Sequence, residues 1–155
     1  MIKDAEYLST EKKKELETEL QDLRGPQRKE ILESLEFAKS LGDLSENAEY
    51  HQARDNQRKL EERIEQIEHI LKNAVIVRES HGEAVNIGST IVIQKVGSKD
   101  NKKFAIVGSE EADMAQGKLS FKSPLGAVLI GKRKGDTVSF KSPNGIIAYK
   151  IVGIE

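Results

Sequence analysis

The feature that most constrains this chain is a long apolar stripe in its first half. The stripe advances by alternating steps of four and three residues through Ala53, Gln57, Leu60, Ile64, Ile67 and Leu71. This spacing is typical of a coiled-coil seam. The outward positions are almost all charged or amide residues, such as Glu61, Glu62, Arg63 and Glu65. The pattern predicts a long helix with one narrow apolar edge, which needs a second helix to cover it.

An earlier stripe provides the second helix. It passes through Leu16, Leu20, Leu23, Ile31 or Leu32, Leu35 and Ala38. Gly25-Pro26 interrupts this stripe, and because proline has no N–H we expect a local kink or break there.

A very short connection separates the two stripes. Gly42 suits the left-handed position just past a helix end, and Asp43 or Ser45 suits the N-cap of the next helix. The simplest solution is a pair of antiparallel helices of roughly 30 residues, each about 45 Å long at ~1.5 Å per residue. We assign this coiled-coil hairpin to residues 1–78, with its tip at about 42–46.

The second half changes to strand-like patterns near Asn73. Short β-rich runs occur at 74–77, 89–93, 103–107, 137–141 and 147–154, and Pro143-Asn144-Gly145 predicts a hairpin between the last two. Residues 123–131 predict one short helix, and the polar stretch 110–119 is expected to be a loop. These elements predict a small antiparallel sheet with one helix at 79–155, and an α+β fold for the chain.

The composition excludes several classes of protein. The chain has 155 residues and no Cys, which leaves no disulfide and no thiolate metal site. The first residues are charged, and no run approaches the ~18 apolar residues of a membrane helix, so we expect a cytoplasmic protein without a signal peptide. Residues 1–78 hold 14 Lys/Arg and 18 Asp/Glu, whereas residues 79–155 hold 11 and 8. Neither half is basic enough to bind duplex nucleic acid through bulk charge alone.

The tip places three acids within seven residues, at Asp43, Glu46 and Glu49. Carboxylates are hard oxygen ligands that suit Mg²⁺, so a pair of them at a projecting tip could donate ligands to a metal shared with another macromolecule. The alternative is a capping box, in which Asp43 caps the next helix and Glu46 reaches back to its start. The spacing alone favours the cap.

A basic run follows the tip on one helical face, at His51, Arg54 and Arg58. With Lys39 on the incoming helix, it could hold RNA phosphates through charge-assisted hydrogen bonds. The alternative, which the spacing alone favours, is a solvated face with ion pairs to Asp55 and Glu62. Tyr50 could stack on a base, although its helical spacing from Ala53 favours packing within the hairpin.

No other group of residues predicts an enzyme pocket. His51, His69 and His81 lack zinc-ligand spacing. The chain has neither a nucleophile elbow nor a phosphate-binding glycine loop. An independent active site is therefore not expected.

Two parts of the sequence resemble one known family. The tip segment 42–51, GDLSENAEYH, together with Ala53-Arg54, closely resembles the tip of the GreA/GreB transcript-cleavage factors. The second domain of that family is matched by short runs at 123–126 (SPLG), 129–132 (LIGK), 135–136 (GD) and 149–151 (YKI). The resemblance covers nearly the whole chain, in order.

The resemblance implies an accessory transcription elongation factor that is not itself an enzyme. The coiled coil would enter the secondary channel of bacterial RNA polymerase, and an FKBP-like C-terminal domain would dock on the channel rim. Asp43 and Glu46 match the family's functional acids, which would help hold the second Mg²⁺ of the polymerase active centre. The polymerase would then hydrolyse its own backtracked transcript. We expect a monomer with no cofactor of its own, and its tip lacks the denser acidic cluster of the anti-cleavage relatives.

The resemblance also assigns roles to the remaining candidate residues. Arg54 matches a basic position expected to contact the extruded 3′ end of the nascent RNA, with His51 and Arg58 nearby. Many family members carry Arg at the position of Lys39, where Lys keeps the charge but loses the bidentate fork. Docking on the polymerase rim would involve exposed positions among Ser123, Pro124, Leu125 and Gly126.

Two other functions remain open on the residues alone. A proline isomerase or chaperone would need an aromatic-lined pocket, and the C-terminal half offers only Phe104, Phe121, Phe140 and Tyr149. A coiled coil that merely plugs a channel would have dispensable acids at its tip.

Overall fold

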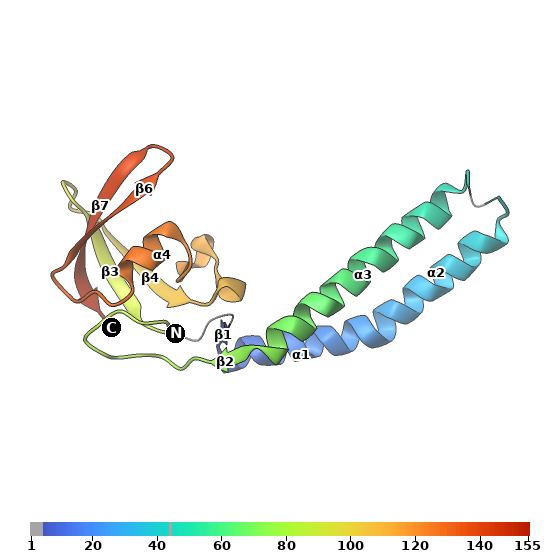
Figure 1. Cartoon of the computed structure of the whole chain (residues 1–155), viewed down its shortest axis with the longest axis horizontal. Helices are drawn as coiled ribbons and strands as arrows, with labels where there is room; N and C mark the ends of the chain where they lie inside the picture. The colour runs from blue at the N-terminus through green and yellow to red at the C-terminus, as the bar shows by residue number, and fades with distance from the viewer. Residues whose placement is uncertain (1–4, 44) are drawn as a thin grey trace. The chain divides into compact units, whose positions relative to one another are not determined.

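The computed structural model describes residues 5–43 and 45–155, which divide into two compact units (Figure 1). One unit is Lys13–Asn73, and the other combines the chain up to Lys12 with Ala74–Glu155. This division differs from the expected boundary at residue 78, because residues 74–76 pair with a strand near the N-terminus. None of the helices in residues 5–43 and 45–155 has the length and the apolar composition that a membrane span requires.

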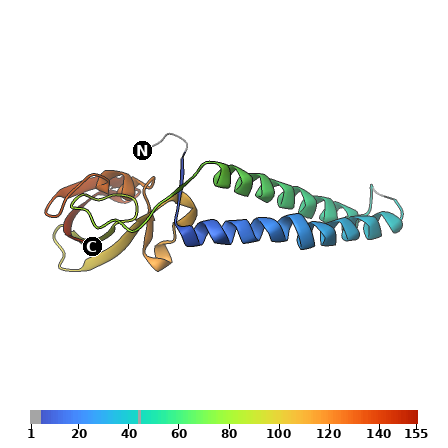
Figure 2. The same cartoon turned by 90° about the horizontal axis from the view of Figure 1, so that it is seen from below.

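The Lys13–Asn73 unit is a hairpin of two helical arms that lie side by side (Figures 1 and 2). The arms are built from α1 (Thr10–Asp22), a π-helical turn η1 (Leu23–Gln27), α2 (Arg28–Ser40) and α3 (Ala48–Lys72). The expected interruption is η1, which contains Pro26, while Asp22 and Arg28 on either side keep right-handed helical backbone. The π turn accommodates the missing N–H of Pro26, so the first arm continues instead of breaking.

The arms pack through a narrow buried edge, as the two stripes predict. Its buried apolar side chains are Leu16, Leu20, Leu23, Leu35, Ala38, Ala53, Leu60, Ile64, Ile67 and Ile70. At the base of the hairpin Ile70 is buried, whereas the expected Leu71 is half-buried. Full burial of one Leu or Ile side chain stabilises by about 1.5–3 kcal/mol. Since isolated helices of this length are marginal in water, the seam supplies most of the stability of both arms.

Ion pairs join the arms outside the seam: Arg24–Glu68, Arg28–Glu61 and Arg63–Glu19. The last two are bidentate, with N–O distances from 2.8 to 3.0 Å. Partly exposed pairs of this kind contribute at most about 1 kcal/mol each. Their main effect is to favour one alignment of the two arms.

The other unit holds a five-stranded sheet in the order β5-β4-β3-β7-β6. Its strands are β3 (Thr90–Lys95), β4 (Asn101–Val107), β5 (Lys118–Ser120), β6 (Thr137–Ser142) and β7 (Gly145–Ile154). β3, β4, β6 and β7 overlap the runs predicted from the sequence. The predicted hairpin is confirmed, because Ser142 pairs with Gly145 across a turn at Pro143-Asn144.

Parts of this unit differ from the sequence expectation. β1 (Glu6–Leu8) pairs in parallel with β2 (Ala74–Ile76), and β5 pairs in parallel with β4, so the strands are not all antiparallel. The stretch 110–119 is not a plain loop, because it contains part of the 3₁₀ turn η2 (Ser109–Glu111), the turn η3 (Met114–Gln116) and the start of β5.

The core of this unit lies between the sheet and α4 (Pro124–Leu129). Its buried members are Val85, Ile91, Ile93, Phe104, Ile106, Leu119, Leu125, Leu129, Val138, Tyr149 and Ile151. The predicted helix at 123–131 is confirmed, with Ser123 as N-cap and Gly131 in the left-handed conformation at φ 81°. A helical hairpin followed by a small sheet with one helix confirms the α+β class.

Gly108 lies where the chain after β4 passes the backbone of β1, and a Cβ there would lie 1.8 Å from the carbonyl oxygen of Tyr7. We expect Gly108→Ala to destabilise the sheet unit by about 1–3 kcal/mol, because backbone must move to make room. Gly82→Ala is the matched control, since its Cβ would meet no atom closer than 3.9 Å. Calorimetry on the full chain should show a lower Tm for the first variant only. Equal Tm values for the two variants would contradict the close approach.

Candidate functional site

The connection between the arms begins with a glycine turn. α2 ends at Ser40, Leu41 is its C-cap, and Gly42 has a φ of 114°. The left-handed position predicted for Gly42 is confirmed. The chain therefore turns away from α2 directly before Asp43.

The second arm begins later than the sequence predicts. The N-cap of α3 is Asn47, whose Oδ1 accepts a hydrogen bond from the backbone N–H of Tyr50 at 3.1 Å. Neither Asp43 nor Ser45 caps the helix, and Glu46 precedes it, so the capping-box interpretation is wrong. The physical reason is that Asn is as good an N-cap as Asp or Ser, and Asn47 directly precedes the good helix former Ala48.

Both acids of the tip are exposed and lie outside regular structure. Asp43 Oδ1 accepts hydrogen bonds from the backbone N–H of Ser45 at 3.0 Å and from its hydroxyl at 2.9 Å. These bonds hold the pKa of the Asp43 carboxyl below its ordinary value, because they favour the charged form, and the bond from the backbone N–H has the larger effect. Within residues 5–43 and 45–155, no hydrogen bond or ion pair occupies Asp43 Oδ2 or the Glu46 carboxylate.

The two carboxylates have the donor chemistry that Mg²⁺ prefers. Among the described residues there is no group of three His, Asp or Glu side chains placed to hold a metal ion. Mg²⁺ requires near-octahedral coordination by oxygen and gives up its waters reluctantly. Asp43 and Glu46 therefore fit a metal site as a partial set of ligands, which donors from elsewhere would have to complete.

The basic candidates differ in how far their charge is already paired. Arg58 pairs along its own helix with Glu62 at 3.0 Å and with Asp55 at 3.9 Å, as the solvated-face alternative predicts. Arg54 and Lys39 are exposed, and neither makes an ion pair or hydrogen bond within the described part of the chain. The charges of Arg54 and Lys39 thus remain available to a phosphate.

The two aromatic rings near the tip lie next to each other. His51 Nε2 lies 3.3 Å from the carbonyl oxygen of Ser45, so this ring contacts the loop that carries the acids. Tyr50 is half-buried, and its ring centroid lies 5.9 Å from that of His51. Its partial exposure agrees with packing at the hairpin and leaves base stacking as a prediction.

The residues predicted to dock on a partner lie at the start of α4, where most of them have structural roles. The Ser123 hydroxyl accepts from Gly126 N–H at 3.0 Å and donates to the carbonyl of Ser120 at 2.7 Å. Leu125 is only 9% exposed and belongs to the core, so it is not one of the exposed positions through which docking was expected. A Cβ on Gly126 would lie 2.0 Å from the Ser120 carbonyl oxygen. Of the four, Pro124 alone is exposed, and a docking role for the group stays a prediction.

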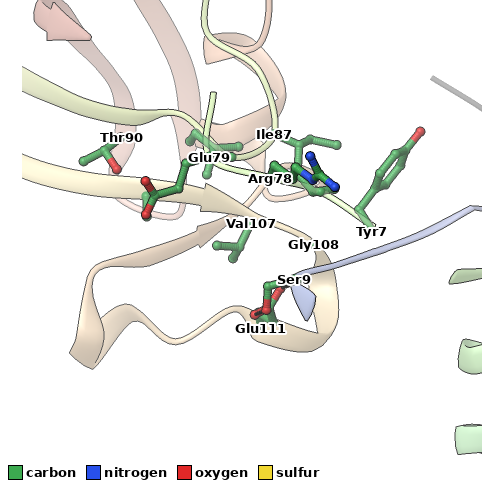
Figure 3. A pocket seen from close by; sticks show the side chains of 13 residues that line it. Tyr7, Ser9, Arg78, Glu79, Ile87, Thr90, Val107, Gly108 and Glu111 are labelled. Atoms are coloured by element: carbon green, nitrogen blue, oxygen red, sulfur yellow. Dashed lines mark hydrogen bonds between the residues drawn. The ribbon is translucent and has the colours of Figure 1, made fainter. Parts of the chain in front are cut away.

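The sheet unit also contains a pocket, formed beside β1 and β4 (Figure 3). Its walls include Arg78, Glu79, Val107 and Tyr7, and among the residues that the structure describes Tyr7 is the one aromatic side chain that lines it. Glu111 in this pocket is already engaged, since it accepts hydrogen bonds from Ser9 N–H at 3.0 Å and Ser9 Oγ at 2.6 Å. This pocket is therefore not the aromatic-lined site that a proline isomerase needs.

Comparison with known proteins gives a consistent result over both halves of the chain. Residues 6–76 match the family model described as "Transcription elongation factor, N-terminal", and residues 79–155 match "Transcription elongation factor, GreA/GreB, C-term". The transcription elongation factor GreA of Clostridium acetobutylicum is 42% identical over 158 residues, with both chains covered in full. The GreA of Lachnoclostridium phytofermentans is 43% identical, covering 100% of this chain and 98% of the relative.

Solved structures of similar proteins are also found. A crystal structure of the GreA factor homolog 1 (Gfh1) protein of Thermus thermophilus is 27% identical and covers 97% of this chain and 99% of its own, with a TM-score of 0.45. A GreA/GreB elongation factor from Nitrosomonas europaea is 20% identical and covers 97% of both chains, with a TM-score of 0.43.

The hydrogen bonds from Ser45 make a prediction about the charge of the tip. In Ser45→Ala the hydroxyl bond to Asp43 is lost while the backbone bond can remain, so the pKa of Asp43 should rise part of the way to its ordinary value. An NMR pH titration of the Asp43 carboxyl carbon in both proteins measures this shift. Ser40→Ala is the control, because its hydroxyl bonds the carbonyl of Phe37 and not Asp43. An Asp43 pKa that is the same in wild type and Ser45→Ala would contradict the observed contact.

Proposed function

Because this chain belongs to the GreA/GreB family of transcription elongation factors, we propose that it stimulates RNA polymerase to cleave its own backtracked transcript. The observation that carries the proposal is that the carboxylates of Asp43 and Glu46 are exposed at the end of a narrow helical hairpin and do not act as the N-cap of α3. A hairpin two helices wide can enter a channel that would exclude a globular domain. In this role the chain is an accessory factor, and the polymerase performs the hydrolysis.

Asp43 and Glu46 are the residues that would hold the metal. Their free carboxylate oxygens would supply part of the coordination of a Mg²⁺ whose other ligands belong to the polymerase active centre. When bound, Mg²⁺ activates water for attack on a phosphodiester and stabilises the charge that develops. The hydrogen bonds from Ser45 lower the Asp43 pKa, because they favour the charged form that binds a metal, and they hold one of its oxygens in a defined direction.

The chain's cations would act on the RNA. Arg54 lies on the arm that follows the tip, about two helical turns into α3. Its guanidinium has no acidic partner among the residues described. It can donate several hydrogen bonds to a phosphate of the extruded 3′ end. Lys39 on the opposite arm can add a point charge. Arg58 and His51 are weaker candidates, because Arg58 is paired with Glu62 and His51 contacts the tip loop.

The sheet unit would hold the factor on the polymerase surface near the channel. Pro124, at the start of α4, is exposed and can contact a partner, whereas Leu125 and Gly126 are buried against the rest of the unit.

One hairpin enters one active centre, so the functional form is a monomer. Since its target is a bacterial transcription complex, the factor works in the cytoplasm.

The direct test uses stalled, backtracked transcription complexes with Mg²⁺ and follows the RNA 3′ end. The wild-type protein should release short 3′ fragments. Asp43→Ala and Glu46→Ala should each lower the cleavage rate at least about a hundredfold, because each removes one metal ligand. Glu49→Gln is the matched control, since Glu49 is an exposed acid in the first turn of α3 and is assigned no role.

Polymerase binding must be measured beside cleavage, by competition with the labelled wild-type factor. Binding should be retained in both alanine variants, because neither side chain packs in the seam. If cleavage persists in both variants at unchanged binding, the tip acids are dispensable. The hairpin would then act only as a plug in the channel.

The difference between Arg54 and Arg58 provides a second prediction. Arg54→Ala should weaken stimulation on long backtracked RNA by several-fold, with a loss that grows smaller as salt rises, because a phosphate contact is screened. Arg58→Ala removes the same charge from the same helix. Because the Arg58 charge is already paired with Glu62 and Asp55, its loss should have only a small effect on stimulation. Equal losses in the two variants would mean that bulk charge, and not Arg54, holds the RNA.

A further inference from the structure

The side chain of Asn47 connects the two arms of the hairpin at the tip. Its Oδ1 accepts the hydrogen bond from Tyr50 N–H at 3.1 Å, and its Nδ2 donates to the carbonyl oxygen of Ala38 at 2.6 Å. The partners fix the orientation of the amide, because a backbone N–H can only donate and a carbonyl can only accept. One residue therefore caps α3 and is bonded to the last turn of α2 at the same time.

This bond lies where the other connections between the arms are sparse. The ion pair nearest the tip among those joining the arms in the described residues is Arg28–Glu61, which lies ten residues before Ala38 along the first arm. The seam narrows to small side chains near the tip, with Ala38 at 1% and Ala53 at 5% exposure. Among the described residues, the Asn47–Ala38 bond is thus a polar contact that joins the two arms across the loop carrying Asp43 and Glu46.

We propose that Asn47 is a positioning residue that holds the two tip carboxylates in the geometry that a shared metal site requires. The inference rests on the proposed function, in which Asp43 and Glu46 serve as ligands. Residues 39–46 lie between the two points that Asn47 joins. Without the bond, the described part of this loop is held to the arms by the backbone of each helix and by the contact of His51 Nε2 with the Ser45 carbonyl oxygen, which reaches one arm only. A loop with more freedom samples more arrangements of its carboxylates, and fewer of them match an octahedral site.

The two roles of Asn47, the N-cap of α3 and the bond to the Ala38 carbonyl, can be separated by substitution. Asn47→Ser and Asn47→Asp both keep an oxygen that can cap α3, but neither can donate from a position that reaches the Ala38 carbonyl. Asn47→Ala loses the cap as well, and serves as the variant in which both roles are removed. Asn56→Ser is the matched control, because Asn56 is exposed on α3 and, within the described part of the chain, its side chain bonds only Gln52 on the same helix.

The mobility of the tip is measured on the free, full-length protein. The chain has no Cys, so Leu41→Cys provides a single site for a nitroxide label at an exposed position beside the loop. Asn47→Ser and Asn47→Asp should increase label mobility at unchanged helix content by circular dichroism. Asn56→Ser should leave the spectrum unchanged. Equal mobility in wild type and both Asn47 variants would overturn the proposal, whatever the protein does to a polymerase.

The functional consequence is measured with unlabelled proteins on backtracked complexes, at saturating factor and over a range of Mg²⁺. Asn47→Ser and Asn47→Asp should bind polymerase as wild type does and lower the maximal cleavage rate by roughly tenfold, because a ligand displaced by about 1 Å loses much of its effect. Loss in Asn47→Ala alone would show that only the cap matters, and would overturn the proposal. If the wild type itself stimulates no cleavage, the proposed function fails first, and that result is distinct from a failure confined to the variants.

Discussion

The structure depends on the apolar contact between α3 and the first arm. α3 is 25 residues long, which corresponds to about 37 Å at ~1.5 Å rise per residue, and only one edge of it is buried. A narrow seam allows two helices to form a thin rod whose remaining surface is charged and soluble. The buried side chains decrease in size toward the tip, from Leu and Ile to Ala38 and Ala53. The rod therefore remains slender at the end that carries the carboxylates.

The start of α3 determines whether those carboxylates are available for chemistry. A carboxylate that caps a helix already accepts backbone hydrogen bonds, which leaves fewer lone pairs for a metal. Asn47 takes the capping position instead, and Asp43 uses one oxygen for Ser45 while its second oxygen and the Glu46 carboxylate have no partner among the described residues. Two acids alone hold Mg²⁺ poorly. This arrangement suits a factor that completes another molecule's active centre better than one with its own.

Much of this architecture could be predicted from the sequence, because it follows from periodic patterns. The alternation of steps in the Ala53–Leu71 stripe identified α3, and Pro143-Asn144-Gly145 identified the last hairpin. β1 could not be found in this way, since it is three residues long and is defined by pairing with β2, more than sixty residues later in the chain. The burial of Leu125 could not be predicted either, because a six-residue helix is too short for its apolar pattern to show which side faces the sheet.

At the tip, the sequence identified the acids but not their surroundings. Asp43, Ser45 and Asn47 are all good N-caps, and local spacing does not choose among them. The sequence did indicate ion pairs to Asp55 and Glu62 on the basic face, and the structure shows that both of them are made by Arg58 and not by Arg54. The measurement that tests the shared site most directly is the Mg²⁺ concentration for half-maximal cleavage by backtracked polymerase, compared between wild type and the isosteric variants Asp43→Asn and Glu46→Gln. A shared site predicts that both variants require more Mg²⁺ than the wild type at equal polymerase binding. The same Mg²⁺ dependence in all three proteins would contradict it.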